Sequence, residues 1–264
     1  MILEDRTLVI SGVGTGLGRE VARLALRDGA RVVLAARTES VLESTAQELD
    51  PSGKRVAYAR TDIKSAEDCE ALTALALERF GRIDAMIQVA AYEIVFGGLH
   101  DTDFEKWRLA YETNVLGSLT LIRAIAPRMK SSGGGSLVLI GSQAMYQQQM
   151  PHAGYAASKG ALLSAMYYLA HELGVDRIRV NMVVPSWMWG PPVETFVKLR
   201  AKSEARSEES VVNEITSRIP LGEIVPDEDV AEAALFLASE RARSITGPVS
   251  YTHLTLPTTG IRWW

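Results

Sequence analysis

The sequence predicts an α/β fold with a doubly wound parallel sheet and helices on both of its faces. Two observations carry this prediction. Short apolar runs of strand length alternate with longer helical patterns along most of the chain. A glycine-rich loop lies between the first apolar run and the first helical pattern. Alternation at this pitch implies parallel strands that are joined by right-handed crossovers.

The strands are expected where apolar and β-branched residues cluster between turn residues. These runs lie at residues 7–11, 31–35, 55–60, 84–89, 136–140 and 179–184. The first run is followed directly by glycine, and the last ends at Pro185.

Helices are expected between and after these strands, at residues 17–28, 39–49, 66–80, 104–129, 154–174 and 227–238. In the first helix, Leu17, Val21 and Leu24 recur at helical spacing. The breaks at residues 50–53 and 131–135 are rich in turn residues and mark the ends of the second and fourth helices.

Residues 190–220 interrupt this rhythm. They are charged and helical in character, and they lie between the sixth strand and the last helix. We expect an insertion above the carboxyl edge of the sheet, where ligands of such folds bind, so this segment is predicted to be a lid over the substrate. No composition shift marks a second domain, and residues 1–248 are expected to form one domain.

Composition and charge exclude several classes of function. The net charge of the 264 residues is −4 with both signs interspersed, so there is no basic footprint for nucleic acid or an anionic membrane. Cys69 is the only cysteine and the four histidines lack ligand-like spacing, which gives no reason to expect a disulfide or a metal site. No apolar run is long enough to span a membrane, and no signal peptide precedes the first strand, so we expect a cytoplasmic protein.

The glycine loop predicts a nucleotide site. Glycines tighten the turn and let the backbone approach a pyrophosphate, and the following helix offers free N–H groups at its N-terminus. The alternative interpretation is a tight turn without a ligand. The residues expected to contact the cofactor here are Ser11, Gly12, Gly14, Thr15, Gly16, Leu17 and Gly18.

The end of the second strand indicates which cofactor binds. An acidic residue there would favour NAD, whereas an arginine suits the 2′-phosphate of NADP. The sequence has Arg37 and no carboxylate at this point, so we expect NADP(H) rather than NAD(H). Asp62, after the third strand, is expected to accept from the adenine amino group. The alternative for Arg37 is a solvated loop residue, and the alternative for Asp62 is an N-cap of the following helix.

A second pattern lies further along the chain. Tyr155 and Lys159 form a Tyr-x-x-x-Lys motif, Ser142 precedes Tyr155 by 13 residues, and Asn114 precedes it by 41. With the glycine loop, these residues resemble the classical short-chain dehydrogenase/reductase family over residues 5–248. The resemblance implies a Rossmann-type fold, a nicotinamide cofactor and a homodimer or homotetramer. It also implies that Ile63, Ala90, Pro185 and Met188 contact the cofactor.

The chemistry of the residues agrees with this resemblance. Tyr155 and Lys159 are neighbours on one helix face, and a nearby ammonium favours the phenolate form of a tyrosine. Tyr155 is then expected to exchange a proton with a carbonyl or alcohol oxygen. The resemblance implies that Ser142 holds the same oxygen, that Lys159 also binds the nicotinamide ribose, and that Asn114 anchors a proton-relay water.

Three positions depart from the family pattern. Residues 88–91 read Gln-Val-Ala-Ala where the family usually has Asn-Asn-Ala-Gly, which puts the hydrogen bonds at this sheet edge in doubt. Ser186 replaces the usual glycine after Pro185. Thr15 stands where many NADP-preferring members carry a basic residue, so the NADP prediction depends mainly on Arg37.

Large and mostly apolar residues lie beside the catalytic motif and after the sixth strand. They are Met145, Tyr146, Met150, His152, Trp187, Met188 and Trp189. As pocket walls, they predict a hydrophobic carbonyl or secondary alcohol as substrate; the alternative is ordinary core packing. The predicted function is therefore an NADP(H)-dependent oxidoreductase. A non-catalytic NADP(H)-binding redox sensor, or an isomerase or lyase on the same fold, remain alternatives.

The last residues do not continue the family pattern. Residues 249–258 resemble the translation of a sequencing-library adapter. We therefore expect residues 249–264 to be a non-native tail that packs poorly on the fold. The alternative is a genuine divergent tail.

Overall fold

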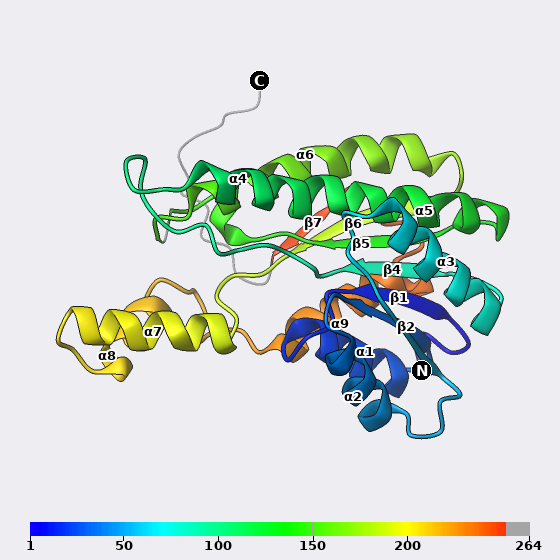
Figure 1. The fold of residues 1–264 in the computed structure, drawn as a ribbon, viewed down its shortest axis with the longest axis horizontal. Helices are drawn as coiled ribbons and strands as arrows, with labels where there is room; N and C mark the ends of the chain where they lie inside the picture. The colour runs from blue at the N-terminus through cyan, green and yellow to red at the C-terminus, as the bar shows by residue number, and fades with distance from the viewer. Residues whose placement is uncertain (149, 252–264) are drawn as a thin grey trace.

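One parallel sheet forms the centre of the molecule (Figure 1). The computed structural model describes residues 1–148 and 150–251. The strands are β1 (Thr7–Ser11), β2 (Arg31–Ala36), β3 (Val56–Arg60), β4 (Ala85–Gln88), β5 (Gly135–Ile140), β6 (Ile178–Val184) and β7 (Val249–Tyr251). Their order in the sheet is β3-β2-β1-β4-β5-β6-β7, and every neighbouring pair is parallel. The six strands expected from the sequence all form, each with its ends within one residue of the expected position.

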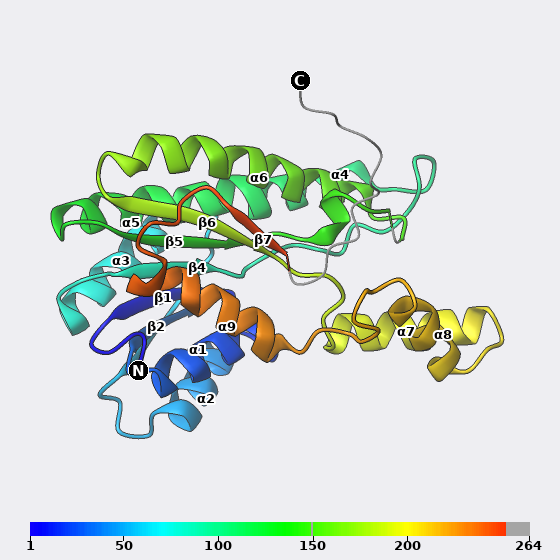
Figure 2. The same ribbon diagram turned by 180° about the vertical axis from the view of Figure 1, so that it is seen from behind.

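Helices cover both faces of the sheet (Figures 1 and 2). One face carries α1 (Leu17–Arg27), α2 (Glu39–Leu49) and α9 (Asp227–Ala238). The other carries α3 (Ala66–Phe80), α4 (Phe104–Tyr111), α5 (Ser118–Ser131) and α6 (Ala153–Gly174).

The strands alternate their side chains between two cores, one on each face. In β1, Leu8 and Ile10 pack in the core under α1 and α9, while Val9 packs in the core under α3 and α5. Because both faces are buried, consecutive positions of the strand are apolar. The predicted doubly wound parallel sheet is confirmed.

The strand order places the ligand site. From β1 the chain builds outward through β2 and β3 in one direction, and through β4, β5 and β6 in the other. Ligands of such sheets bind at the carboxyl ends of the strands where this direction reverses. The loops after β1, β4 and β5 therefore meet at one crevice.

The helix expected over residues 104–129 forms, but it is not a regular α-helix throughout. Residues Glu112–Gly117 (η1) form a π-helical stretch between α4 and α5. Asn114 lies in this stretch and is fully buried. Apolar periodicity predicts the helix, but it does not reveal the wider π-helical turn, which holds one more residue than an α-helical turn. Such turns are frequent at functional sites.

Two helices form the segment that interrupts the strand–helix rhythm. They are α7 (Pro191–Ser203) and α8 (Glu208–Thr216), and they project from the sheet body beyond its carboxyl edge (Figures 1 and 2). They have a small apolar core of their own, in which Val197, Val211 and Ile215 are buried. Trp187 joins this core through a ring contact with Phe196, whose centroid lies 5.2 Å away.

The seventh strand begins inside the segment that the sequence sets apart as a tail. Val249, Ser250 and Tyr251 pair in parallel with Met182, Val183 and Val184 of β6. Val249 and Tyr251 pack partly buried against the core under α6. The sheet therefore extends past residue 248, and the rest of the expected tail, residues 252–264, lies outside the described residues.

Within residues 1–148 and 150–251, no helix has the length and apolar character needed to cross a membrane.

Candidate active site

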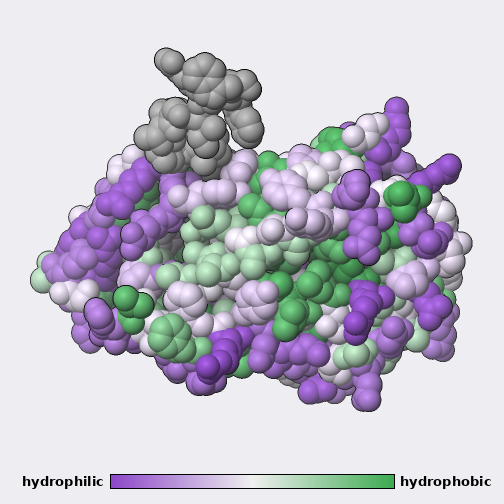
Figure 3. All heavy atoms as spheres, turned by 90° about the horizontal axis from the view of Figure 1, so that it is seen from above, coloured by the Kyte–Doolittle hydropathy of each residue, from purple (hydrophilic) through white to green (hydrophobic). Residues whose placement is uncertain are grey.

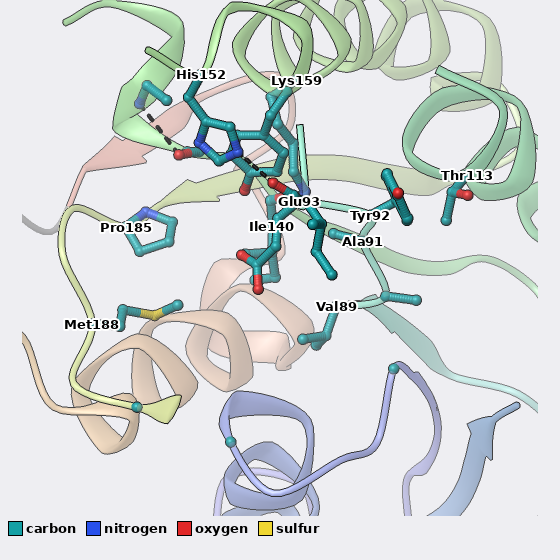
Figure 4. Close-up of a pocket in the computed structure, with 18 of the residues that line it drawn as sticks. Val89, Ala91, Tyr92, Glu93, Thr113, Ile140, His152, Lys159, Pro185 and Met188 are labelled. Atoms are coloured by element: carbon teal, nitrogen blue, oxygen red, sulfur yellow. Dashed lines mark hydrogen bonds between the residues drawn. The ribbon is translucent and has the colours of Figure 1, made fainter. Parts of the chain in front are cut away.

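A cavity of about 1830 Å³ runs along the carboxyl edge of the sheet, from the glycine loop to helix α7. Figure 4 shows its central part. All the residues expected to bind the cofactor line it: Ser11, Gly12, Gly14, Thr15, Gly16, Leu17, Gly18, Arg37, Asp62, Ile63, Ala90, Tyr155, Lys159, Pro185 and Met188. Of the expected substrate-pocket residues, Met145, Met150, His152 and Trp187 line it, whereas Trp189 is not among the lining residues and is 46% exposed.

The glycine loop is held against the end of the sheet. Gly12 donates from its backbone N–H to Ala35 at 2.8 Å, and its φ of +88° lies in the left-handed region. A Cβ on Gly12 would lie 2.3 Å from the backbone nitrogen of Ala90, so no other residue fits there. By contrast, a Cβ on Gly14 would meet no atom of the described residues within 4 Å, because this side of the loop faces the cavity.

The loop also provides the polar groups that a dinucleotide needs. Helix α1 begins after Gly16 without a side-chain cap, which leaves its first N–H groups to a ligand. The buried hydroxyl of Ser11 has no hydrogen-bond partner among the described residues. An open backbone, an uncapped helix and an unsatisfied hydroxyl fit a pyrophosphate, so these residues fit a dinucleotide cofactor.

The far end of the cavity carries positive charge. Arg37 is exposed, lines the cavity and forms no ion pair with a residue that the structure describes. Lys64 also lines the cavity, and its ammonium lies 4.0 Å from a carboxylate oxygen of Asp62. The other oxygen of Asp62 accepts from the backbone N–H of Lys64 at 3.0 Å, so Asp62 orders this turn.

At the centre of the cavity, α6 presents Tyr155 and Lys159 one turn apart. Lys159 is 2% exposed, and its ammonium donates to the carbonyl oxygen of Ile140, at the end of β5, at 2.7 Å. The same ammonium lies 5.7 Å from the centroid of the Tyr155 ring. Ser142, two residues after β5, shares a hydrogen bond with the Tyr155 side chain.

Burial shifts the proton affinities of both α6 residues. Burial raises the pKa of Tyr155 above its usual value; the nearby carboxylate of Glu93 raises it further, while the hydrogen bond with Ser142 lowers it. Burial lowers the pKa of the Lys159 ammonium to about 8, against the opposing effect of the Glu93 carboxylate. At neutral pH the site therefore holds a neutral phenol, and the neighbouring lysine loses its proton at a lower pH than an ordinary lysine does.

Asn114 connects the π-helical stretch to two parts of the site. Its side-chain oxygen accepts from the backbone N–H of Tyr92 at 2.6 Å, and its side-chain nitrogen donates to the Tyr92 carbonyl at 3.0 Å and to the Ser158 hydroxyl at 2.9 Å. Asn114 does not itself line the cavity, although its neighbour Thr113 does. Its side chain fixes the loop after β4 against helix α6.

His152 is stacked between two rings. Its ring centroid lies 4.6 Å from that of Tyr155 and 4.7 Å from that of Phe96, with interplanar angles of 18° and 15°. The His152 Nε2 atom is hydrogen-bonded to the backbone carbonyl of Glu93 (Figure 4). Burial lowers the pKa of His152, so the imidazole is neutral and holds one face of the Tyr155 ring.

The departure at residues 88–91 keeps the backbone bonds of this sheet edge, but the side-chain oxygen of the buried Gln88 has no hydrogen-bond partner among the described residues. The backbone N–H groups of Val89 and Ala90 both donate to the Ser11 carbonyl, at 2.9 and 3.0 Å, and the Gln88 side chain donates to the Ala90 carbonyl at 3.2 Å. Ala91 is not among the residues with positive φ, so its position does not require glycine.

Sequence reasoning missed Glu93 and Phe96, which come from the loop after β4 and line the cavity. A signal was present, because Glu93 is the only charged residue in the run from Val89 to Phe96. In the described part of the chain, no cluster of His, Cys, Asp and Glu has the arrangement needed to hold a metal ion.

A doubly wound sheet with a glycine loop and a dinucleotide-sized cavity at its switch point defines a nucleotide-dependent α/β enzyme.

Comparisons with known proteins show to which family of such enzymes the chain belongs. A family model described as enoyl-(acyl carrier protein) reductase matches residues 12–253. Dehydrogenase/reductase SDR family member 4 from Bos taurus is 31% identical over 245 residues, which cover 93% of this chain and 85% of that protein. L-rhamnose 1-dehydrogenase (NAD(P)(+)) from Azotobacter vinelandii is 31% identical over 94% of each chain.

Solved structures agree. A short-chain type dehydrogenase/reductase from Mycobacterium ulcerans has a TM-score of 0.86 and 28% identity over 96% of this chain and 90% of its own. A variant of actinorhodin polyketide ketoreductase, solved with NADPH, has a TM-score of 0.86 and 28% identity over 94% and 95% of the two chains. The chain belongs to the short-chain dehydrogenase/reductase family and is an NAD(P)-dependent oxidoreductase.

Proposed function

We propose that the protein is an NADP(H)-dependent oxidoreductase that interconverts hydrophobic carbonyl compounds and secondary alcohols at Ser142, Tyr155 and Lys159. The observation that carries this proposal is the phenol of Tyr155, which is hydrogen-bonded to Ser142 and lies beside the buried ammonium of Lys159. When bound, the nicotinamide cofactor supplies or accepts the hydride.

Tyr155 is the general acid and base of the proposed reaction. Its raised pKa keeps the phenol protonated at neutral pH, and a protonated phenol is the form that gives a proton to a carbonyl oxygen during reduction. Ser142 supports the same substrate oxygen by a hydrogen bond, because its hydroxyl already lies within reach of the phenol. In the reverse direction, Tyr155 takes the proton from the alcohol.

Lys159 has two proposed tasks. Its ammonium favours the phenolate that forms as Tyr155 gives up its proton. One of its three protons is bound to the Ile140 carbonyl, which leaves two for the nicotinamide ribose hydroxyls. Asn114 remains the proposed anchor of a proton-relay water, although its side-chain amide is also engaged with Tyr92 and Ser158.

The preference for NADP(H) is proposed from the charge at the adenosine end. Arg37 has no described ionic partner and lines the cavity, and a guanidinium matches the geometry of a phosphate. Lys64 adds a second cation near the same end. Among the structural neighbours, the actinorhodin polyketide ketoreductase variant is described with NADPH.

The substrate is proposed to be hydrophobic because apolar side chains form the walls around Tyr155. Those that line the cavity include Phe96, Met145, Met150, Trp187 and Phe196. We also propose that residues 190–220 cover the substrate as a lid, since Phe196 and Leu199 of α7 line the cavity and Leu199 is still 65% exposed.

A panel of ketones and secondary alcohols tests the proposal. The absorbance of the reduced nicotinamide is followed with NADP(H) and NAD(H) in turn. We expect turnover of hydrophobic ketones with a preference for NADPH. Tight binding of NADPH with no turnover of any compound would instead support the redox sensor, and product formation without net consumption of NADPH would support an isomerase or lyase.

A homodimer or homotetramer is proposed from the helical face shown in Figure 3, where apolar residues form a band over α4, α5 and α6. Leu109, Tyr111, Leu116, Tyr167 and Tyr168 are each at least 38% exposed on these helices and on the π-helical stretch. Apolar area of this kind in a single chain marks an interaction surface, and a second copy of the chain would cover it. Light scattering coupled to size-exclusion chromatography measures the oligomeric state.

A further inference from the structure

One carboxylate lies near the proposed catalytic residues of the cavity. Glu93 lines the cavity in the loop after β4, between Tyr92 and Ile94. This loop is fixed on two sides, because Tyr92 is bound through its backbone to Asn114, and the carbonyl of Glu93 is bound to His152. The backbone at Glu93 is therefore held by the same contacts that connect this loop to helix α6.

The Glu93 side chain points into the open cavity, toward the side on which Val89, Pro185 and Met188 lie (Figure 4). Its negative charge acts on both proposed catalytic groups, since it favours the protonated forms of Tyr155 and Lys159. A ligand whose reacting oxygen meets Tyr155 would thus have its neighbouring atoms within the field of this carboxylate.

The Glu93 carboxylate forms no direct ion pair with a described residue, although its charge acts on the buried ammonium of Lys159. It also forms no side-chain hydrogen bond with the described residues. Lys159 directs its ammonium to the Ile140 carbonyl, and Arg200, a cation of the lid that also lines the cavity, is paired with Glu204 and Glu214. A bound cation could therefore form the direct ion pair with this half-buried carboxylate that no described side chain forms.

We propose that Glu93 selects substrates that carry a protonated amine close to the reacting carbon, namely hydrophobic amino ketones and amino alcohols. The hydrophobic body would contact Phe96, Met145 and Trp187, while the ammonium would pair with Glu93. This inference rests on the proposed function, because it assumes that the reacting oxygen lies at Tyr155.

A matched pair of ketones tests this selection. In α-aminoacetophenone an ammonium replaces the terminal methyl group of propiophenone, so the two differ in charge and little in shape. We expect Glu93→Gln to lower the ratio of their kcat/KM values, amine over neutral, by roughly tenfold, which corresponds to about 1.4 kcal/mol. The ammonium group also makes the carbonyl more reactive, and it does so equally in both proteins. The readout is therefore the difference in this ratio between wild type and Glu93→Gln.

Asp101→Asn is the matched control. Asp101 follows Glu93 in the same loop, is exposed, and does not line the cavity, so its loss removes one negative charge without touching the proposed pair. The control should keep the wild-type ratio. An equal fall of the ratio in both variants would mean that net charge alone attracts the amine and would overturn the proposal.

The remaining outcomes are also decisive. If Glu93→Gln slows both ketones equally, the carboxylate supports Tyr155 and Lys159 without selecting the substrate, and the proposal fails. If the wild-type protein reduces neither ketone, the wider panel of ketones and alcohols decides the proposed reaction, and calorimetric binding of the two compounds to the NADP⁺ complex decides the role of Glu93. A tighter Kd for the amine that is lost in Glu93→Gln supports the selection, and equal Kd values overturn it.

Discussion

Single residues bring together parts of the chain that are far apart in sequence, and Tyr155 is where most of them meet. The Tyr155 ring stacks on His152, and its hydroxyl shares a hydrogen bond with Ser142. The ammonium of Lys159 lies 5.7 Å from the centroid of the same ring. Tyr155→Phe should keep this packing and remove only the proton donor. We expect turnover to fall about 10²–10⁴-fold. Fluorescence titration should show nearly unchanged NADPH affinity, and a variant that keeps most of the wild-type rate would contradict the role of Tyr155.

Lys159 sets a pH dependence whose direction follows from its charge. Lysine is cationic below its pKa, and burial lowers that pKa to about 8. We expect kcat/KM for NADPH, which reports ionisations of the free enzyme, to be level below about pH 8 and to fall above it. Because the Glu93 carboxylate raises this pKa, Glu93→Gln should move the falling limb to lower pH. A limb that stays in place would show that the limiting group is not Lys159.

Arg37 is the residue on which the cofactor preference depends. Replacing it with Ala removes a charge-assisted fork to the 2′-phosphate, an interaction of roughly 1.5–3 kcal/mol. The affinity for NADPH should therefore fall about 10- to 150-fold, with the affinity for NADH little changed. Arg60→Ala, an exposed arginine outside the cavity, is the control. Equal losses for both cofactors would mean that Arg37 supports the loop and does not bind the phosphate.

Spacing along the chain predicts some of the contacts between single residues of the site and does not predict others. Tyr155 and Lys159 are one helical turn apart, so a linear motif reveals them. Glu93 and His152 are in contact although 59 positions separate them in the sequence. No local periodicity encodes such a contact, because it depends on how a loop after β4 lies over the start of α6.

At the scale of elements, the π-helical stretch shows how one helix serves both packing and function. Its buried Asn114 makes hydrogen bonds to the backbone of Tyr92 and to Ser158. Asn114→Ala would leave the buried N–H and carbonyl groups of Tyr92 without these partners, at a cost of roughly 1–3 kcal/mol. Denaturant unfolding should show this loss, whereas Asn213→Ala, on the exposed side of α8, should be neutral. Equal stability of the Asn114 variant and wild type would contradict the anchoring role.

The elements themselves were the most predictable part of the structure. Buried strands such as β1 are mostly apolar runs that end at turn residues, and helices such as α1 repeat apolar residues at 3.6-residue spacing, so local sequence is sufficient for both. The internal geometry of the helix at Glu112–Gly117 was not predictable, because a π turn uses the same residue types as an α turn.

At the scale of the whole molecule, the position of the cavity follows from the sheet order, while its walls do not. The glycine loop and parallel alternation require a crevice at the carboxyl ends of β1 and β4. Trp187 and Trp189 are only two residues apart, yet Trp187 lines the cavity and Trp189 does not. The backbone bonds between this segment and Val225 decide which side chain turns inward, and those bonds come from a distant part of the chain.

The C-terminal boundary of the fold leads to a prediction of stability. Three residues, Val249–Tyr251, extend the sheet along β6, and the Tyr251 ring lies 5.5 Å from that of Tyr146. The family match also ends close by, at residue 253. We still propose that the following residues are foreign to the fold, because their sequence resembles an adapter and Pro257 would remove a ladder donor from any strand there.

Two truncations separate the real strand from the proposed foreign segment. Removing residues 252–264 should leave Tm unchanged or slightly higher, since that segment was never fitted to this sheet. Removing residues 249–264 should lower Tm by roughly 2–8 °C, because the edge of β6 loses its partner and Tyr146 loses its ring contact. Differential scanning calorimetry measures both. If the shorter truncation already unfolds the protein, the last residues are a native part of the structure and the adapter interpretation is wrong.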